Sequence, residues 1–143
     1  MDIDVDTGVY KVRRFYALDD CGTRINPMII EGQVHGGLTE AFAIAMGQEI
    51  RYDPEGNVVT GSFMNFFMPT AVETPHWETD FTVTPSPHHP IGAKGVGESP
   101  NVGVPAFSNA VNDAFSFLGS THIQMPHDYW RNWKAAKDLG AVA

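Results

Sequence analysis

The chain has 143 residues, of which 43% are hydrophobic and 11% aromatic, and its formal net charge is −8. This length and composition fit one globular segment over residues 1–143, and the acidic balance argues against a nucleic-acid partner, because Lys and Arg are the residues that bind a phosphate backbone. The sequence has neither a long apolar run nor a basic leader, so we expect a cytoplasmic protein without a membrane span.

The first elements predicted along the chain form a β-hairpin. Residues 2–5 and 9–18 alternate apolar with polar side chains on either side of residues 6–8, whose sequence Asp-Thr-Gly is a turn signal. Such alternation on both sides of a glycine turn is typical of two antiparallel strands. A loop over residues 19–24 is expected to follow.

A long helix is predicted from residue 27 to about residue 46. Asn26 is a favourable cap, and the proline that follows suits the first helical position because its missing N–H is not needed there. The helix contains Gly32, Gly36 and Gly37, each of which costs about 1 kcal/mol relative to alanine in a helix interior. Two explanations stay open for these glycines: close packing against another element, or close approach to a ligand.

The middle of the chain predicts a second hairpin. Residues 48–52 and 58–63 have the composition of strands, and residues 53–57 (Asp-Pro-Glu-Gly-Asn) form a strong turn signal between them. Residues 65–69 continue as an apolar stretch that we expect to be buried. The aromatic side chains of Phe63, Phe66 and Phe67, in and next to this stretch, are expected in the core. The alternative is that they line a substrate funnel. A further short strand is predicted over residues 81–84.

A second main helix is predicted from about Asn101 to Leu118, closed by Gly119. Its expected apolar face consists of Val102, Pro105, Ala106, Ala110, Val111, Ala114, Phe115 and Leu118. A short strand and a terminal helix are expected after that, with Trp130 and Trp133 docking the helix. The predicted fold class is therefore α+β, with short hairpins and strands, two main helices and a short terminal helix.

Between these elements, Gly92, Gly95 and Gly97 predict a loop whose backbone N–H groups are free to meet an anion or a flat cofactor. Glu98 lies at the mouth of this loop. It is either a helix-start residue that complements the helix dipole or a catalytic base, and the residues alone favour the first reading. The glycine spacing differs from the dinucleotide-binding fingerprint, so a Rossmann fold is not expected.

Four segments of the chain, in order, resemble the large subunit of the molybdenum hydroxylase family, which includes xanthine dehydrogenase, aldehyde oxidase and carbon monoxide dehydrogenase. Residues 92–100 (Gly-Ala-Lys-Gly-Val-Gly-Glu-Ser-Pro) resemble the active-site glutamate segment of this family. Residues 20–27 (Asp-Cys-Gly-Thr-Arg-Ile-Asn-Pro), residues 31–37 (Glu-Gly-Gln-Val-His-Gly-Gly) and the turn at residues 53–56 also resemble it. The resemblance extends from about residue 4 to residue 130, and it identifies the chain as the C-terminal molybdopterin-binding segment.

The resemblance implies an oxidoreductase that hydroxylates an N-heterocycle or aldehyde-type substrate with water as the oxygen source. It implies that Glu98 is the general base of this reaction. It assigns contacts with the cofactor to five residues, namely Gln33, Lys94, Gly95, Val96 and Gly97. The amide of Gln33 suits such a contact because it both donates and accepts hydrogen bonds. In this family no protein side chain is a ligand of the metal, so none is expected here.

The implied cofactor is molybdenum-molybdopterin, in bacterial members commonly the cytosine dinucleotide form. Iron–sulfur clusters and FAD are expected only on partner chains or domains, since Cys21 is the single cysteine. The family's large subunit is several times longer than this chain, so we expect the remainder of that subunit as a partner and no activity without it. The alternative is a non-catalytic assembly module of the same fold that binds no molybdenum.

Other residue types offer weaker candidate sites. His35, His88 and His89 suggest a metal site, but the histidine pair lies among prolines without the spacing of metal ligands. Ser99 lies outside the Gly-x-Ser-x-Gly pattern of a hydrolase elbow, so a hydrolase is not expected. The acidic neighbours of Cys21 argue against a cysteine nucleophile.

Overall fold

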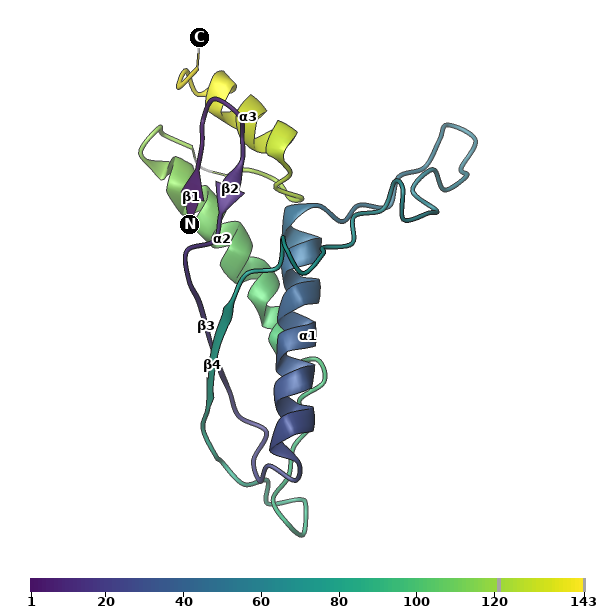
Figure 1. The fold of residues 1–143 in the computed structure, drawn as a ribbon, viewed down its shortest axis with the longest axis vertical. Helices are drawn as coiled ribbons and strands as arrows, with labels where there is room; N and C mark the ends of the chain where they lie inside the picture. Colours follow the sequence, from purple (N-terminus) through teal and green to yellow (C-terminus); the bar gives the residue numbers. More distant parts are fainter. Residues whose placement is uncertain (121, 143) are drawn as a thin grey trace.

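The computed structural model describes residues 1–120 and 122–142, and the α+β class predicted from the sequence is confirmed. Its elements in chain order are β1 (Asp2–Ile3), β2 (Tyr10–Lys11), β3 (Phe15–Asp19), α1 (Pro27–Met46), β4 (Trp77–Phe81), the 3-10 helix η1 (Ser99–Val102), α2 (Gly103–Ser116) and α3 (Tyr129–Asp138). In Figure 1, α1 runs along the long axis beside α2 and the β3–β4 pair, while the β1–β2 hairpin and α3 lie together at one end.

The N-terminal hairpin is shorter than predicted. Asp2 pairs with Lys11 and Ile3 with Tyr10, after which the chain leaves the hairpin. Residues 15–18 lie in a strand as predicted, but the predicted hairpin pairing over residues 9–18 is wrong, because β3 separates from the hairpin and pairs in parallel with β4. The strand predicted over residues 81–84 is also misplaced, since β4 spans residues 77–81.

Aromatic packing accounts for the parallel β3–β4 pair. The ring of Phe15 on β3 lies 5.6 Å from that of Trp77 on β4 and 4.6 Å from that of Phe107 on α2. Phe107 also packs edge-on against Phe42 of α1 at 5.6 Å. Burial of these rings ties the strand pair to both helices, and each buried aromatic ring contributes about 2 kcal/mol or more to this joint. The core therefore lies where α1, α2 and the β3–β4 pair meet.

Helix α1 has the predicted bounds. The Asn26 side chain accepts a hydrogen bond of 3.3 Å from the backbone N–H of Ile29, as expected of a cap. At Gly37 an added Cβ would lie 2.7 Å from the Cβ of Pro100, so this glycine lets η1 pack closely on the helix. At Gly32 and Gly36 the same position meets nothing within 4 Å, and close packing within this chain therefore explains Gly37 alone.

Helix α2 begins two residues later than predicted, because the 3-10 helix η1 precedes it. Its buried residues recur every fourth position and are Gly103, Phe107, Val111 and Phe115. The predicted apolar face is confirmed for Val111 and Phe115. It is wrong for Val102, Pro105 and Ala106, which are exposed, because the change of helix type at Gly103 shifts which side chains point inward.

Residues 51–74 form an extended arm that projects away from the helices (Figure 1). The turn at residues 53–57 is confirmed by a 3.0 Å hydrogen bond from the N–H of Asp53 to the carbonyl of Asn57. The strands predicted on both sides of it are wrong, since only an isolated bridge between Tyr52 and Val58 forms there. The stretch at residues 65–69, predicted to be buried, is exposed or half-buried, and Phe63 is 83% exposed. Phe67 differs from Phe63, because it is half-buried and packs against the core beside Gly47.

Helix α3 docks through its polar and small residues. Asn132 is fully buried and donates hydrogen bonds to the carbonyls of Gly8 and His127, at 3.3 and 3.1 Å. Ala136 is buried beside it. The predicted docking by Trp130 is wrong, because this side chain is exposed and Trp133 is only half-buried. The short strand predicted before α3 is absent from the described residues there, and no described helix is long and apolar enough to span a membrane.

Candidate functional site

The glycine segment that carries Glu98 is held along the loop that follows β3. The carbonyl of Gly92 accepts hydrogen bonds from the N–H groups of Thr23 and Ser86, at 3.2 and 3.0 Å. Gly22 and Ala93 then form an isolated antiparallel bridge. Gly22 has a φ of +64°, and a Cβ there would lie 2.1 Å from the Gly92 carbonyl oxygen, so only glycine fits this approach. The two loops that resemble the family's motifs are therefore joined through their backbones.

Two adjacent carboxylates hold the next part of the segment. The Lys94 ammonium lies 2.8 Å from Oδ1 of Asp20, while the Lys94 N–H donates to the carbonyl of Cys21 at 2.8 Å. The Ser99 hydroxyl donates to Oδ1 of Asp19. The Lys94 ammonium, followed by donors from Thr84 and Gly22, holds the pKa of the Asp20 carboxyl well below its usual range. Neither aspartate is recognisable as part of the site from the sequence alone.

Glu98 is exposed at the end of this loop, immediately before η1. Its side chain forms no capping hydrogen bond with η1, so the helix-start reading has no hydrogen bond to support it. The position of η1 is fixed by its contact with α1, because Pro100 is buried against Gly37. The Glu98 carboxylate is thus presented outward from a held backbone.

The predicted cofactor residues divide into two groups. Gln33 is exposed on α1, and its Oε1 lies 3.7 Å from the position of a Cβ on Gly97, so α1 and the glycine segment meet here. Within the described residues, the N–H groups of Gly95, Val96 and Gly97 donate no hydrogen bond. Lys94 differs, because both its N–H and its ammonium are already paired with the loop after β3.

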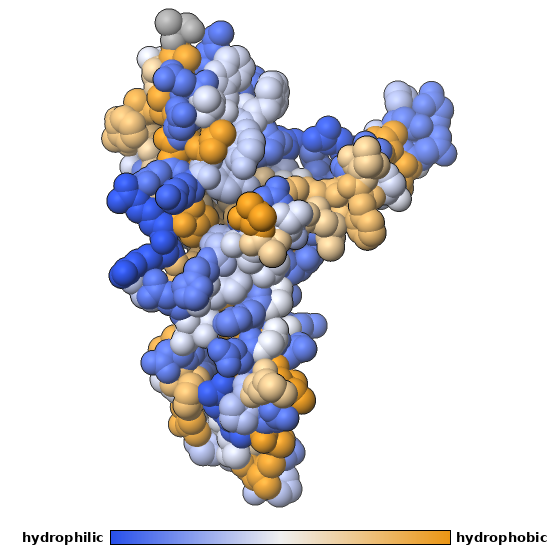
Figure 2. Space-filling model, in the orientation of Figure 1, coloured by the Kyte–Doolittle hydropathy of each residue, from blue (hydrophilic) through white to orange (hydrophobic). Residues whose placement is uncertain are grey.

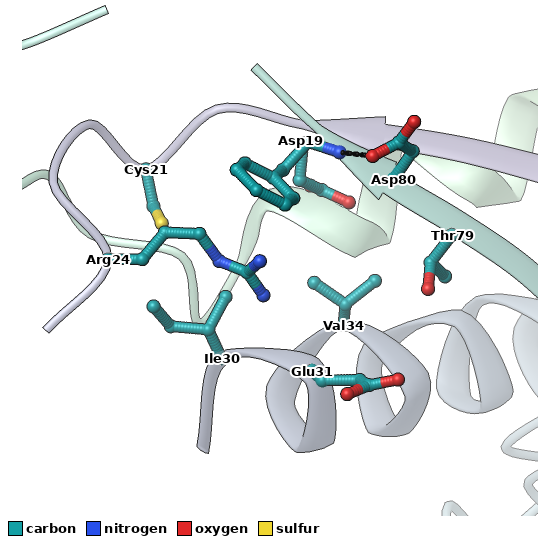
Figure 3. Close-up of a pocket in the computed structure, with 9 residues that line it drawn as sticks. Asp19, Cys21, Arg24, Ile30, Glu31, Val34, Thr79 and Asp80 are labelled. Carbon is teal, nitrogen blue, oxygen red and sulfur yellow. Dashed lines mark hydrogen bonds between the residues drawn. The ribbon is translucent and has the colours of Figure 1, made fainter. Parts of the chain in front are cut away.

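A cavity of about 160 Å³ opens between the ends of β3 and β4 and the first turns of α1 (Figure 3). The Arg24 side chain reaches into it from the loop after β3, and its guanidinium lies 4.0 Å from the centre of the Phe81 ring. Nε of Arg24 is buried without a hydrogen-bond partner among the described residues. The carboxylate residues Asp19, Asp80 and Glu31 also line the cavity. This cavity was not predicted from the sequence.

The histidines considered as metal ligands lie apart. His35 is half-buried on α1 with its Nε2 3.5 Å from the Thr79 hydroxyl, whereas His88 and His89 are exposed in the loop after β4. Within residues 1–120 and 122–142, no group of three or more His, Cys, Asp or Glu side chains is arranged to hold a metal ion.

Comparison with known proteins places this geometry in a family. Residues 1–75 match the family model of the molybdopterin cofactor-binding domain. The chain is 82% identical to the carbon monoxide dehydrogenase large chain of Afipia carboxidovorans over 98% of its length, and 39% identical to the nicotine 6-hydroxylase large subunit of Paenarthrobacter nicotinovorans over 88%. It spans only 17% and 16% of these relatives.

A crystal structure of a Cu,Mo-containing carbon monoxide dehydrogenase superposes on 99% of the chain with a TM-score of 0.95 and 80% identity, and the chain covers 18% of that protein. The extended arm is thus part of a shape that this relative shares. The family model describes a molybdopterin-binding domain, and the relatives are a dehydrogenase and a hydroxylase, both of them oxidoreductases. The chain belongs to the molybdopterin cofactor-binding family and is part of a molybdenum hydroxylase large subunit.

Proposed function

We propose that this chain supplies the general base of a molybdenum hydroxylase and part of the site for its molybdopterin. The observation that carries the proposal is the Glu98 carboxylate, which is exposed at the end of a loop whose backbone is fixed on both sides. A base must reach the reacting atoms with a carboxylate that nothing else occupies. Glu98 meets this requirement within the described residues.

The residues around Glu98 fit the edge of a pterin, which carries both hydrogen-bond donors and acceptors. The Gln33 amide offers both types of group, and it lies next to Gly97. The N–H groups of Gly95, Val96 and Gly97 are unpaired within the described chain, and a Cβ at Gly95 would meet nothing within 4 Å. Lys94 has less to offer, since of its backbone groups only the carbonyl is left for such a contact. The cytosine dinucleotide form is proposed from the family resemblance.

When bound, the molybdenum centre supplies the two-electron oxidation of the substrate. The oxygen that enters the product comes from water, so a proton has to leave that oxygen as its bond to carbon forms. Glu98 accepts this proton and later releases it to solvent. Gln33 and the glycine segment would hold the cofactor edge near Glu98, because α1 and η1 are locked together at Gly37.

The similarity to relatives favours carbon monoxide as the substrate of the complex. The identity to the carbon monoxide dehydrogenase large chain is 82%, against 39% to the nicotine 6-hydroxylase large subunit. An N-heterocycle or aldehyde-type substrate, which the family resemblance implies, remains the second candidate. Turnover of carbon monoxide, an N-heterocycle and an aldehyde by the same preparation distinguishes the two.

Activity requires the polypeptide that provides the rest of the large subunit, because this chain corresponds to about a sixth of its relatives. Partner subunits or domains with iron–sulfur clusters and FAD are proposed to carry the electrons away. A cytoplasmic location for the assembly remains a prediction from the sequence.

The proposed function is tested in the assembled complex with Glu98→Gln. This change keeps the size of the side chain and removes the base, so kcat is expected to fall at least about 100-fold. Molybdenum and pterin contents, measured by elemental analysis and cofactor extraction, are expected to stay unchanged. Glu55→Gln, in the exposed turn of the arm, is the matched control. Full turnover by the Glu98 variant, or an active complex without molybdenum, rejects the proposal.

A further inference from the structure

Asp19 is the last residue of β3, and Asp20 directly follows it. The two carboxylates reach different partners, although their backbones are adjacent. Both partners, Lys94 and Ser99, belong to the glycine segment that carries Glu98.

Of the two carboxylates, that of Asp20 forms more hydrogen bonds within the described chain. Besides the Lys94 ammonium, its carboxylate accepts hydrogen bonds from the backbone N–H of Gly22 at 2.9 Å, the backbone N–H of Thr84 at 3.1 Å and the Thr82 hydroxyl at 3.3 Å. One side chain thus joins the loop after β3, the loop after β4 and the start of the glycine segment. These donors fix the carboxylate, so it holds Lys94 at a defined place.

Asp19 acts at the other end of the same segment. Its carboxylate accepts the hydroxyl hydrogen of Ser99, which directly follows Glu98. The Asp19 side chain also lines the cavity next to α1, where it is half-buried. A carboxylate there keeps few hydrogen bonds to water, which favours a lasting bond to Ser99.

Between these two anchors, Val96 is half-buried against the core, and it is the one residue of 95–98 that packs there in the described chain. Gly95, Gly97 and Glu98 are exposed, and a Cβ at Gly95 would meet nothing within 4 Å. Four residues with two flexible glycines would otherwise sample many backbone conformations. The place of the Glu98 carboxylate therefore depends on where Lys94 and Ser99 are held.

We propose that Asp19 and Asp20 are positioning residues, which together place Glu98 by anchoring the two ends of its loop. The proposal rests on the role of Glu98 as the base. A shift of about 1 Å in a base is enough to lower turnover roughly 100-fold, whereas the affinity for substrate depends on other contacts. Loss of an anchor is therefore expected to lower kcat while KM and cofactor content stay nearly unchanged.

The first measurement needs no turnover. In the assembled complex, hydrogen exchange of the peptide covering residues 92–100 is compared between the parent protein, Asp20→Asn and Asp19→Asn. Each variant weakens one anchor while keeping the side chain's size, so exchange in this peptide is expected to rise at least about tenfold, as local opening becomes easier. Asp113→Asn is the control, since Asp113 is exposed on α2. Unchanged exchange in both anchor variants overturns the proposal.

The second measurement separates positioning from general stability. Asp20→Asn and Asp19→Asn are expected to lower kcat about tenfold or more with KM changed less than about twofold. Because Asp20 acts through Lys94, Asp20→Asn and Lys94→Met are expected to be non-additive in kcat, the double variant being no slower than the slower single variant. Additive losses, or an equal fall in molybdenum content, overturn the proposal.

The Glu98→Gln variant distinguishes the two hypotheses. If Glu98→Gln retains turnover while the anchor variants raise hydrogen exchange in residues 92–100, Glu98 is not the base. Asp19 and Asp20 then anchor a loop that has a different function. If Glu98→Gln abolishes turnover while the anchor variants change neither exchange nor kcat, the base stands and the positioning role is rejected.

Discussion

His127 is a buried histidine whose protonation opposes folding. Its side chain is fully buried, and Nε2 lies 2.9 Å from the Ser108 hydroxyl on α2. Burial, together with the charges of His122 and Arg131, lowers the pKa of His127 from 6.5 to about 4. Its contribution to stability is therefore complete above pH 6.5, where both folded and unfolded forms are neutral, and is lost as the pH falls from 6.5 to 4.

We expect the free energy of opening of α3 to fall by at most about 1.4 kcal/mol per pH unit in that interval. Hydrogen exchange of residues 129–138 in the assembled protein, corrected for the intrinsic exchange rate, measures it. His127→Gln removes the titrating group, so this pH dependence is expected to disappear. A slope that survives in the variant assigns the effect to another group.

Two glycines in turns with positive φ form a matched pair. Gly8 has a φ of +72°, and a Cβ there would lie 1.8 Å from the carbonyl oxygen of Tyr129, whereas at Gly56, with a φ of +89°, it would meet nothing. Gly8→Ala is expected to destabilise the docking of α3 by at least about 2 kcal/mol. Gly56→Ala, which carries only the backbone strain, is expected to leave α3 unchanged. Hydrogen exchange of α3 distinguishes them, and equal effects would contradict the close contact at Gly8.

At the scale of elements, the contact between α1 and η1 fixes the position of the loop that carries Glu98. Gly37→Ala places a methyl group 2.7 Å from the Cβ of Pro100, and because a proline ring cannot move aside alone, η1 is expected to shift. We expect faster hydrogen exchange at residues 98–102 and a lower kcat. Gly36→Ala, one position along the same helix, meets nothing within the described chain and is expected to leave exchange at these residues unchanged.

Local signals predicted the elements that depend on local physics. The bounds of α1 followed from Asn26 and the proline after it, and the turn in the arm followed from its residue types. The β3–β4 pair was missed because its partners are distant in sequence and are joined by the packing of Phe15 and Trp77. The alternation of residues 9–18 indicates strands without saying which partner they pair with.

In the candidate site too, some residues could be predicted from the sequence, whereas others depend on contacts that only the fold creates. Glu98 was predicted from the resemblance of its glycine segment to a family, and the structure places Gln33 beside that segment. The roles of Asp19 and Asp20 were not predictable, because an acidic pair after a strand has no specific partner in the sequence. Only the fold brings Lys94 and Ser99 to them.

For the whole molecule, the exposed apolar side chains of the arm are the main feature that the described chain leaves unexplained. Phe63 is 83% exposed, Met64 91% and Val72 94%, and Figure 2 shows hydrophobic atoms gathered along the arm. Exposed apolar groups in such a run mark a contact surface. The chain covers only 17% of the carbon monoxide dehydrogenase large chain, so we expect the missing part of the large subunit to cover these apolar side chains.

The double substitution Phe63→Ser and Met64→Ser tests that expectation. Removing two large apolar side chains from a contact surface is expected to weaken assembly with the complementing polypeptide at least about tenfold, because each contributes roughly 1 kcal/mol or more when buried. Titration of the labelled chain with that polypeptide measures the affinity. Glu55→Ser, at the exposed tip of the same arm, is expected to bind as the parent chain does. Unchanged affinity of the double variant for the complementing polypeptide would place the interface elsewhere on the chain. The isolated double variant is also expected to self-associate less than the parent chain, since the exposed apolar surface of the arm would drive self-association as well.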